Sequence, residues 1–248
     1  MRSSNVRSAK SAAVLAALVA LAGCSPRAPQ PPPDPPDYGP ARQLLAEGQY
    51  RQAAEELGRQ MARDPAPPAE LRYAFALALA NAGEASASTR EALLAIDQVR
   101  GTPAEPVLWH LVLANALRAG DASQARDALS AMLARCEEVH RPAARQAGAV
   151  GPPGTASASR EMAAARRALL EGNVVRATGI YSGVLELRPE SPLVRLCLAE
   201  CLRRLGDFAA ARRFLDDVLP AALPHSPWRD LLVDAHRALY GRLCPSGA

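Results

Sequence analysis

The chain has 248 residues, a formal net charge of +4, and 49% hydrophobic but only 4% aromatic residues. This length is enough for one or two domains with a buried core, and so high an apolar content excludes a wholly disordered chain. Alanine and leucine supply most of the apolar residues, which also excludes an all-β protein.

The excess positive charge lies at the N-terminus. Arg2, Arg7 and Lys10 precede every acidic residue, and the chain beyond them holds 26 basic and 25 acidic residues. Because this body is nearly neutral, it offers no electrostatic attraction for DNA or RNA. We therefore expect no nucleic-acid partner.

Residues 1–23 have the features of a cleaved signal peptide. The basic residues precede an apolar run from Ala12 to Ala22, about half the length that a membrane-spanning helix needs. The run ends in Leu21-Ala22-Gly23-Cys24, which resembles the lipobox of bacterial lipoproteins. The alternative is an ordinary secretory signal followed by a chance cysteine.

The lipobox resemblance implies an address for the protein. In lipoproteins the cysteine, here Cys24, receives a diacylglycerol, becomes the new N-terminus after cleavage and is acylated again. Several acyl chains give stable anchoring, whereas a single chain is marginal. Ser25 follows Cys24, where Asp would indicate inner-membrane retention. The resemblance therefore implies the outer membrane of a Gram-negative bacterium, on its periplasmic face.

Residues 24–40 form a predicted proline-rich tether. Half of the sixteen residues between Ser25 and Pro40 are proline. Proline fixes φ and lacks an N–H, so the segment favours an extended polyproline II conformation of about 3.1 Å per residue and about 50 Å in all. Pro32-Pro33-Asp34-Pro35 also fits a PxxP docking motif, which is the alternative to a plain spacer.

From residue 41 onward, apolar residues recur at helical spacing and glycines recur at nearly constant intervals. The glycines, each predicted to end a helix of about 14 residues, are Gly48, Gly83, Gly120, Gly172, Gly206 and Gly241. A small residue stands five positions after each of the first five glycines, namely Ala53, Ser88, Ala125, Ala177 and Ala211. The residues nine positions after are mostly large, namely Leu57, Ala92, Leu129, Tyr181 and Leu215. This pattern predicts helical hairpins stacked side by side.

The pattern resembles the tetratricopeptide repeat, a pair of helices of about 34 residues that often ends in proline. Three segments carry the resemblance best: residues 45–65, residues 171–189 and Leu205-Gly206-Asp207-Phe208-Ala209-Ala210-Ala211. The resemblance implies an all-α, right-handed superhelical solenoid with repeats 1–3 in residues 41–140 and repeats 4–5 in residues 159–225. The second repeat departs from the pattern because it lacks its final proline.

Two segments interrupt the repeats. Residues 141–158 contain Arg141-Pro142 and a run of glycine and proline, which predicts a loop insertion. In residues 226–248, Ser226-Pro227-Trp228 predicts the start of a lone helix, with serine as its cap. Such a helix would cover the apolar face at the end of the array.

No motif indicates catalysis, a cofactor or a metal. Gly151-Pro-Pro-Gly154-Thr155 looks like the start of a phosphate-binding loop, but the glycine and lysine that should follow are missing. Cys136 and His140 have metal-ligand spacing, but two ligands are too few. We therefore expect a protein that is not an enzyme, although an envelope-polymer hydrolase without a recognisable motif is the alternative from another class.

Four cysteines remain beyond Cys24, and their pairing is open. Cys136, Cys197, Cys201 and Cys244 permit three connectivities in an oxidising compartment. A link from Cys197 or Cys201 to Cys244 would join the terminal helix to the array. Buried free thiols are the equal alternative.

In tetratricopeptide arrays the first helices of the repeats line a concave groove that holds a peptide or a partner helix. The resemblance implies that the groove residues here are Tyr73, Leu77, Asn81, His110, Arg118, Met162, Arg166, Glu200, Arg203, Arg204 and Trp228, with Arg42 beside them. Arg118, Arg166 and Arg203 are predicted to form a cradle for carboxylates. The predicted function is a lipid-anchored periplasmic scaffold that binds an envelope protein. The preferred role is pilus or secretion-system assembly, because the layout is pilotin-like, and the alternative role is an adaptor for peptidoglycan enzymes.

Overall fold

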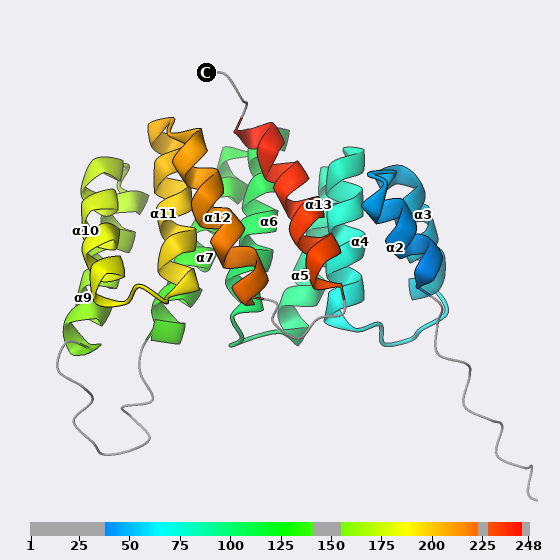
Figure 1. Cartoon of the computed structure of the whole chain (residues 1–248), viewed down its shortest axis with the longest axis horizontal. Coiled ribbons are helices and arrows are strands. Elements are labelled where there is room, and N and C mark those ends of the chain that lie inside the picture. Colours follow the sequence, from blue (N-terminus) through cyan, green and yellow to red (C-terminus); the bar gives the residue numbers. More distant parts are fainter. Residues whose placement is uncertain (1–37, 141–154, 223–227, 245–248) are drawn as a thin grey trace, which may run out of the picture. The chain divides into compact units, whose positions relative to one another are not determined.

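The computed structural model describes residues 38–140, 155–222 and 228–244, and all regular secondary structure in these ranges is α-helical (Figure 1). The predicted signal peptide, Cys24 and nearly all of the tether lie outside the described residues, as does Ser226-Pro227. The helices are α2 (Gly39–Ala46), α3 (Tyr50–Met61), α4 (Ala69–Ala82), α5 (Ala85–Gln98), α6 (Ala104–Ala119), α7 (Ala122–His140), α9 (Thr155–Leu170), α10 (Val174–Leu187), α11 (Pro192–Leu205), α12 (Phe208–Ala222) and α13 (Arg229–Leu243). Among the helices so described, none is both long and apolar enough to cross a bilayer.

Five of the predicted glycine turns are confirmed. Gly206 ends α11 with φ of +85°, a left-handed conformation that costs a residue with a Cβ but not glycine. Its N–H donates to the carbonyl of Arg203 (3.1 Å), and the N–H of Asp207 donates to that of Leu202 (2.9 Å), which is a Schellman motif. The same pair of hydrogen bonds and a positive φ end the first helix at Gly48, Gly83, Gly120 and Gly172.

The helix that follows each turn starts at a polar residue. Asn173 accepts a hydrogen bond from the N–H of Arg176 (3.2 Å), and Asp121 and Asp207 accept equivalent bonds from the third residue beyond them (2.9 and 3.0 Å). These side chains satisfy N–H groups that have no partner inside the helix. Gln49 and Glu84 precede their helices without such a bond.

The predicted register of small and large residues is confirmed by burial. All ten residues at the fifth and ninth positions after the glycines are buried, and Leu57 and Leu215 are 0% exposed. The small residue lets the two helices of a hairpin approach closely, and the larger one fills the space between neighbouring hairpins. The register therefore places the core of the array.

Three boundaries differ from the prediction. α2 begins at Gly39, so Pro40 lies in its first turn rather than in the tether. α9 begins at Thr155, inside the predicted loop 141–158, and residues 141–154 lie outside the described residues. Gly241 does not end its helix, because α13 continues to Leu243 and Arg212 of α12 donates to the carbonyl of Gly241 (3.2 Å).

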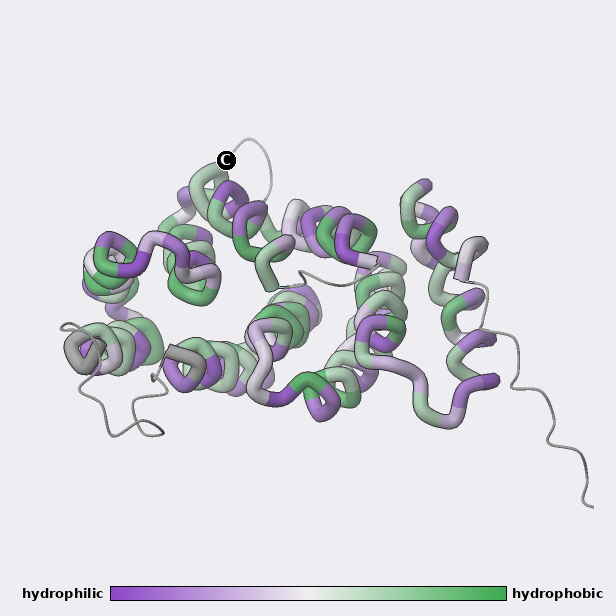
Figure 2. Tube along the Cα trace, turned by 60° about the horizontal axis from the view of Figure 1, so that its bottom comes forward, coloured by the Kyte–Doolittle hydropathy of each residue, from purple (hydrophilic) through white to green (hydrophobic). Residues whose placement is uncertain are grey.

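The helices pack as five hairpins, α2–α3, α4–α5, α6–α7, α9–α10 and α11–α12, and each hairpin contacts the next along the chain. The final helix α13 packs on α12, as expected for a capping helix. It also packs on α4, α6 and α2, far earlier in the chain (Figure 1). Most helices alternate hydrophilic and hydrophobic residues along their length, as amphipathic helices do (Figure 2).

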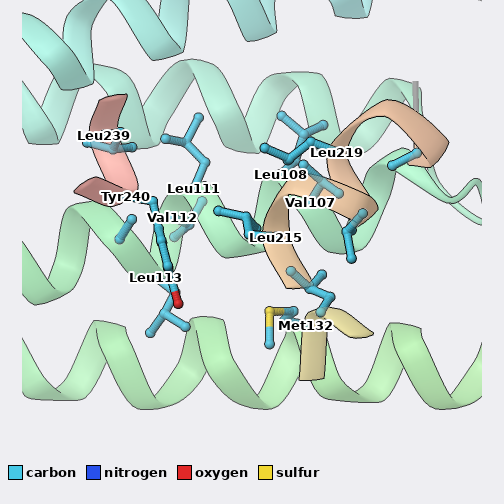
Figure 3. Close-up of a cluster of buried hydrophobic side chains, with 14 of the residues drawn as sticks. Val107, Leu108, Leu111, Val112, Leu113, Met132, Leu215, Leu219, Leu239 and Tyr240 are labelled. Atoms are coloured by element: carbon cyan, nitrogen blue, oxygen red, sulfur yellow. The ribbon is translucent and has the colours of Figure 1, made fainter. Parts of the chain in front are cut away.

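Helix α6 lies at the centre of this arrangement. Apolar residues of α6, including Val107, Leu108 and Leu111, meet Leu215 of α12 and Leu239 of α13 in one buried cluster (Figure 3). The inner side of α6 is therefore covered by the C-terminal helices of the same chain. The sequence did not predict this cover. It determines whether the predicted partner-binding groove is open to solvent.

Candidate partner-binding groove

Four of the five predicted groove residues of the second and third hairpins lie in the surface that α13 covers. Tyr73, Leu77 and Asn81 of α4 and His110 of α6 are at most 6% exposed. We call the surface that these four residues form the α4–α6 groove. It is occupied by a helix of the same chain rather than open to solvent.

A chain of three polar side chains joins the groove to α13. The Oη of Tyr73 lies 2.6 Å from Nδ1 of His236, and Nε2 of His236 lies 2.9 Å from Nδ1 of His110. The two imidazole rings are stacked, with centroids 5.2 Å apart and planes 11° from parallel. His236 uses both ring nitrogens, so its contacts fix the orientation of α13 on the groove.

Both histidines are neutral near pH 7. Burial, together with the nearby charge of Arg203, lowers the pKa of His110 to about 3. Burial and the neighbouring His110 lower the pKa of His236 well below its usual value. Burial also raises the pKa of Tyr73, which keeps its hydroxyl protonated. The site is therefore uncharged where the three groups meet.

Asn81 anchors the other end of the groove. Its Nδ2 donates to the carbonyl of Ala235 on α13 (2.9 Å) and to the carbonyl of Leu77 (3.0 Å). Its backbone carbonyl accepts from Arg242 of α13 (2.7 Å). Its Oδ1 is buried and has no hydrogen-bond partner among the described residues. Both hydrogen bonds from Nδ2 go to carbonyl oxygens. Flipping the side-chain amide would turn Oδ1 toward these carbonyls, so a flip would not give Oδ1 a donor.

Trp228 fixes the start of α13 against α2. Its ring packs edge-on against Tyr38 with centroids 5.5 Å apart, and the guanidinium of Arg42 lies 5.6 Å above it. The prediction that Trp228 belongs to the groove stays a prediction for an external partner. In this structure the tryptophan is part of the helix that fills the groove.

Each of the three predicted cradle arginines binds an acceptor within the chain. Arg118 donates to the carbonyl of Ala80 at the end of α4, and Arg166 of α9 pairs with Glu137 of α7 (3.5 Å). Arg203 grips Glu200 through two hydrogen bonds (2.8 and 2.9 Å). The acceptors lie on three different helices, so these contacts do not join the arginines into one cradle.

The remaining predicted residues divide into buried and exposed groups. Met162 is buried on α9, which packs against α7 and α10. Glu200 is 0% exposed and also binds Arg204 (2.8 Å). Arg118 lines an open hollow of about 490 Å³ beside the start of α5. Arg118 and Arg166 are thus partly exposed, and Arg204 is exposed, on α6, α9 and α11.

All four described cysteines are free and buried, in agreement with the free-thiol alternative. The thiol of Cys197 hydrogen-bonds with Cys136 and Tyr181, whereas Cys244 lies beside Tyr240. Burial raises the pKa of Cys201 to about 12, so its thiol is protonated and a poor nucleophile.

Sequence reasoning named Tyr73, Asn81 and His110 but missed their partner on α13. His236 is 163 residues from Tyr73 and 126 from His110, so no local pattern joins them. The available signal was the stripe Trp228, Leu232, His236 and Tyr240, at intervals of four along one helix. Over the described part of the chain, no group of three His, Cys, Asp or Glu residues is placed to hold a metal ion.

A match to a family model agrees with the hairpins at the C-terminal end of the array. Residues 168–234, from the end of α9 into α13, match the tetratricopeptide repeat family model. The crystal structure of the C-terminal part of a TPR repeat-containing protein from Cytophaga hutchinsonii aligns with 80% of this chain and 84% of its own, at 14% identity and a TM-score of 0.34. No curated protein matches the sequence.

The repeated turns and the buried register define an all-α array of helical hairpins with a C-terminal capping helix, and residues 168–234 of this array match the tetratricopeptide repeat family model. Such arrays generally bind other proteins. The helices and their hairpin arrangement confirm the predicted all-α fold class.

Proposed function

We propose that the chain is a non-catalytic, lipid-anchored adaptor that binds another protein of the bacterial envelope through its helical repeats. One observation carries the binding part of this proposal. The α4–α6 groove already holds a helix, through apolar contacts and through hydrogen bonds from Tyr73, Asn81 and His110. A surface that binds one amphipathic helix has the chemistry to bind another.

The cellular location in this proposal rests on the sequence. The lipobox ending at Cys24 supports acylation, and the proline-rich tether supports a separation of about 50 Å between the lipid and the repeats. The proposed location is the periplasmic face of the outer membrane. The layout of lipobox, tether and repeats supports a role in pilus or secretion-system assembly, by analogy with assembly lipoproteins.

The anchoring is tested by expressing the natural chain and its Cys24→Ser variant in a Gram-negative host. We expect mass spectrometry to show an acylated N-terminal cysteine at position 24 and the protein in the outer-membrane fraction. The variant should keep its signal peptide and lose the acyl mass. A mature N-terminus at any other residue would refute lipid anchoring at Cys24.

The partner is tested by affinity capture from crosslinked cells. A variant that replaces Arg118 of α6 and Arg166 of α9 with Gln removes two partly exposed charges on the first helices of their hairpins and keeps the Arg203–Glu200 pair. The matched control replaces the exposed Arg126 and Arg213, on the second helices of their hairpins, with Gln. We expect one envelope component to be enriched by wild type and control but reduced with the first variant. Equal capture by all three would refute binding through these two first-helix arginines.

A further inference from the structure

Helix α10 carries apolar side chains on a face that is open in the described part of the chain. Its buried residues Ala177, Tyr181 and Val184 lie in the array, where α10 packs on α9 and α11 (Figure 1). Val175 and Leu187 lie outside this packed face and are 72% and 62% exposed, the highest values among the large apolar residues of the described ranges. A helix that is apolar on both sides is normally covered on both sides.

This composition sets α10 apart from the second helices of the other four hairpins. α10 contains only two charged residues, Arg176 and Glu186, whereas α3, α5, α7 and α12 contain between three and five each. Leu93 and Leu94 of α5 are also exposed, but less so, at 39% and 42%. The open face of α10 is therefore the most apolar exposed surface among these second helices.

Two glycines lie between the exposed apolar residues of α10. Beyond the adjacent residues and the helix backbone, nothing in the described structure lies within 4 Å of a Cβ built at Gly179 or at Gly183. Because glycine has no side chain, another helix could approach the backbone closely at these two positions. The middle of the face thus has room for a second helix.

The two charges of α10 are placed against the helix dipole. Arg176 lies in the first turn, where an acidic residue is favourable, and Glu186 lies in the last turn, where a basic residue is favourable. Neither side chain has an ion pair or a hydrogen bond among the described residues. Helix stability and contacts within the chain therefore do not explain these two residues. An antiparallel second helix with the same sequence would supply an opposite charge to each.

The pattern of the open face is symmetric in sequence about Tyr181. Arg176 and Glu186 lie five residues before and after Tyr181, Val175 and Leu187 lie six residues before and after it, and the two glycines lie two. A two-fold axis at this level would place an identical helix antiparallel to α10. Arg176 then lies beside Glu186 of the second copy, and Val175 beside its Leu187. The axis repeats both contacts, because the same patch serves both copies.

We propose that the open face of α10 is a dimer interface, and that its occupant is α10 of a second copy of this chain, packed antiparallel. The charges select this occupant, because the face is electrostatically complementary to itself in that orientation. The inference goes beyond the proposed function and does not rest on it, since neither a lipid anchor nor an envelope partner enters the argument.

The expected affinity is modest. One helix face on each copy makes an interface at the small end of the range for specific contacts, so we expect a Kd of about 10–100 µM and a monomer in dilute solution. A dimer presents the repeats twice. It would therefore gain avidity for a partner that is itself present in several copies.

The test measures self-association of the full chain by sedimentation equilibrium, with Cys24→Ser in every version so that no acyl chain contributes. Arg176→Glu and Glu186→Arg each bring like charges together in the proposed dimer. Both substitutions suit the helix dipole, so α10 stays folded. Combining the two in one chain restores opposite charges. Arg213→Glu makes the same charge change as Arg176→Glu at an exposed position of α12 and is the matched control.

We expect the Cys24→Ser chain and the Arg213→Glu control to dimerise alike. Each single variant, Arg176→Glu or Glu186→Arg, should dimerise at least about fivefold more weakly, and the combined variant should return to within about twofold of the unaltered interface. An equimolar mixture of the two single variants should form heterodimers, because every charge then meets an opposite one. Val175→Ser should also weaken the dimer by removing an apolar contact.

Three results would overturn the proposal. A chain that stays monomeric at every concentration would exclude a second copy as the occupant and leave the face to a helix of another protein. A dimer that the single variants do not weaken would have its interface elsewhere. Weakened single variants that recover neither as a mixture nor as the combined variant would exclude the antiparallel pairing of Arg176 with Glu186.

Discussion

Acid should destabilise the folded chain through two buried histidines, His110 and His236. Both have pKa values below the ordinary 6.5 in the folded protein, so the folded state excludes protons that the unfolded state binds. The stabilisation is therefore fully present above about pH 6.5 and is lost as the pH falls below that value. The test replaces both residues with Gln, which keeps hydrogen-bonding groups at these positions but does not titrate.

The size of the effect follows from the shift at His110. The unfolded imidazole titrates near 6.5 and the folded one near 3, so between these values each pH unit removes about 1.4 kcal/mol. At pH 5 the loss from His110 alone is about 2 kcal/mol. His236 is 0% exposed and shifted in the same direction, so it adds to this loss.

The groups around the two histidines agree with a loss of stability at low pH. Tyr73 and Tyr240 face the two imidazoles and are neutral, and Arg203 of α11 opposes protonation of His110. Glu200, the nearby acid on α11, is bound by two arginines. A proton on either ring is thus not compensated by a free carboxylate at this site.

The assay is urea unfolding followed by circular dichroism, between pH 7.5 and pH 5, for wild type and the double Gln variant. Surface carboxylates, His140 and His225 are common to both chains, so their contributions cancel in the difference. We expect wild type to lose at least about 2 kcal/mol more than the variant over this range. Equal losses in the two chains would refute the burial of a neutral histidine pair.

Three further predictions concern the array. Leu215→Ala should lower the free energy of unfolding by about 3 kcal/mol, because the side chain is fully buried against α6; a loss below about 1 kcal/mol in urea unfolding would contradict that placement. Gly206→Ala should cost about 1–2 kcal/mol because φ is +85°, whereas Gly183→Ala inside α10 should cost nothing; equal melting temperatures for the two would count against the turn. Glu200→Ala should cost about 3 kcal/mol by leaving two arginines without their buried acid, and an unchanged melting temperature would disprove that role.

The hairpins could be predicted because their chemistry is local. A glycine turn, a capping residue and a small residue five positions later lie within one stretch of chain, and each turn repeats the same hydrogen bonds. The same rule was wrong at Gly241, where α13 continues to Leu243 and the carbonyl of Gly241 accepts a hydrogen bond from Arg212 of α12. Turn chemistry identifies a helix end only where residues close in sequence supply the hydrogen-bond partners.

The site was harder to predict for a physical reason. The helix faces could be assigned from periodicity, which is why Tyr73, Asn81 and His110 were named together. Whether that face is open depends on how the hairpins stack, and this sums small rotations along the whole array. The contact of His236 with residues more than 120 positions earlier follows from that stacking and has no local signal.

The central claim is that the C-terminal helix fills the groove of the early repeats instead of only capping the array. Its most direct test replaces Trp228 with the photo-crosslinker p-benzoylphenylalanine in the full chain, followed by mass spectrometry of the crosslinked peptides. The structure places this side chain against Tyr38 and Arg42, so we predict crosslinks to α2. Crosslinks confined to α11 and α12 would show a simple cap and contradict the account.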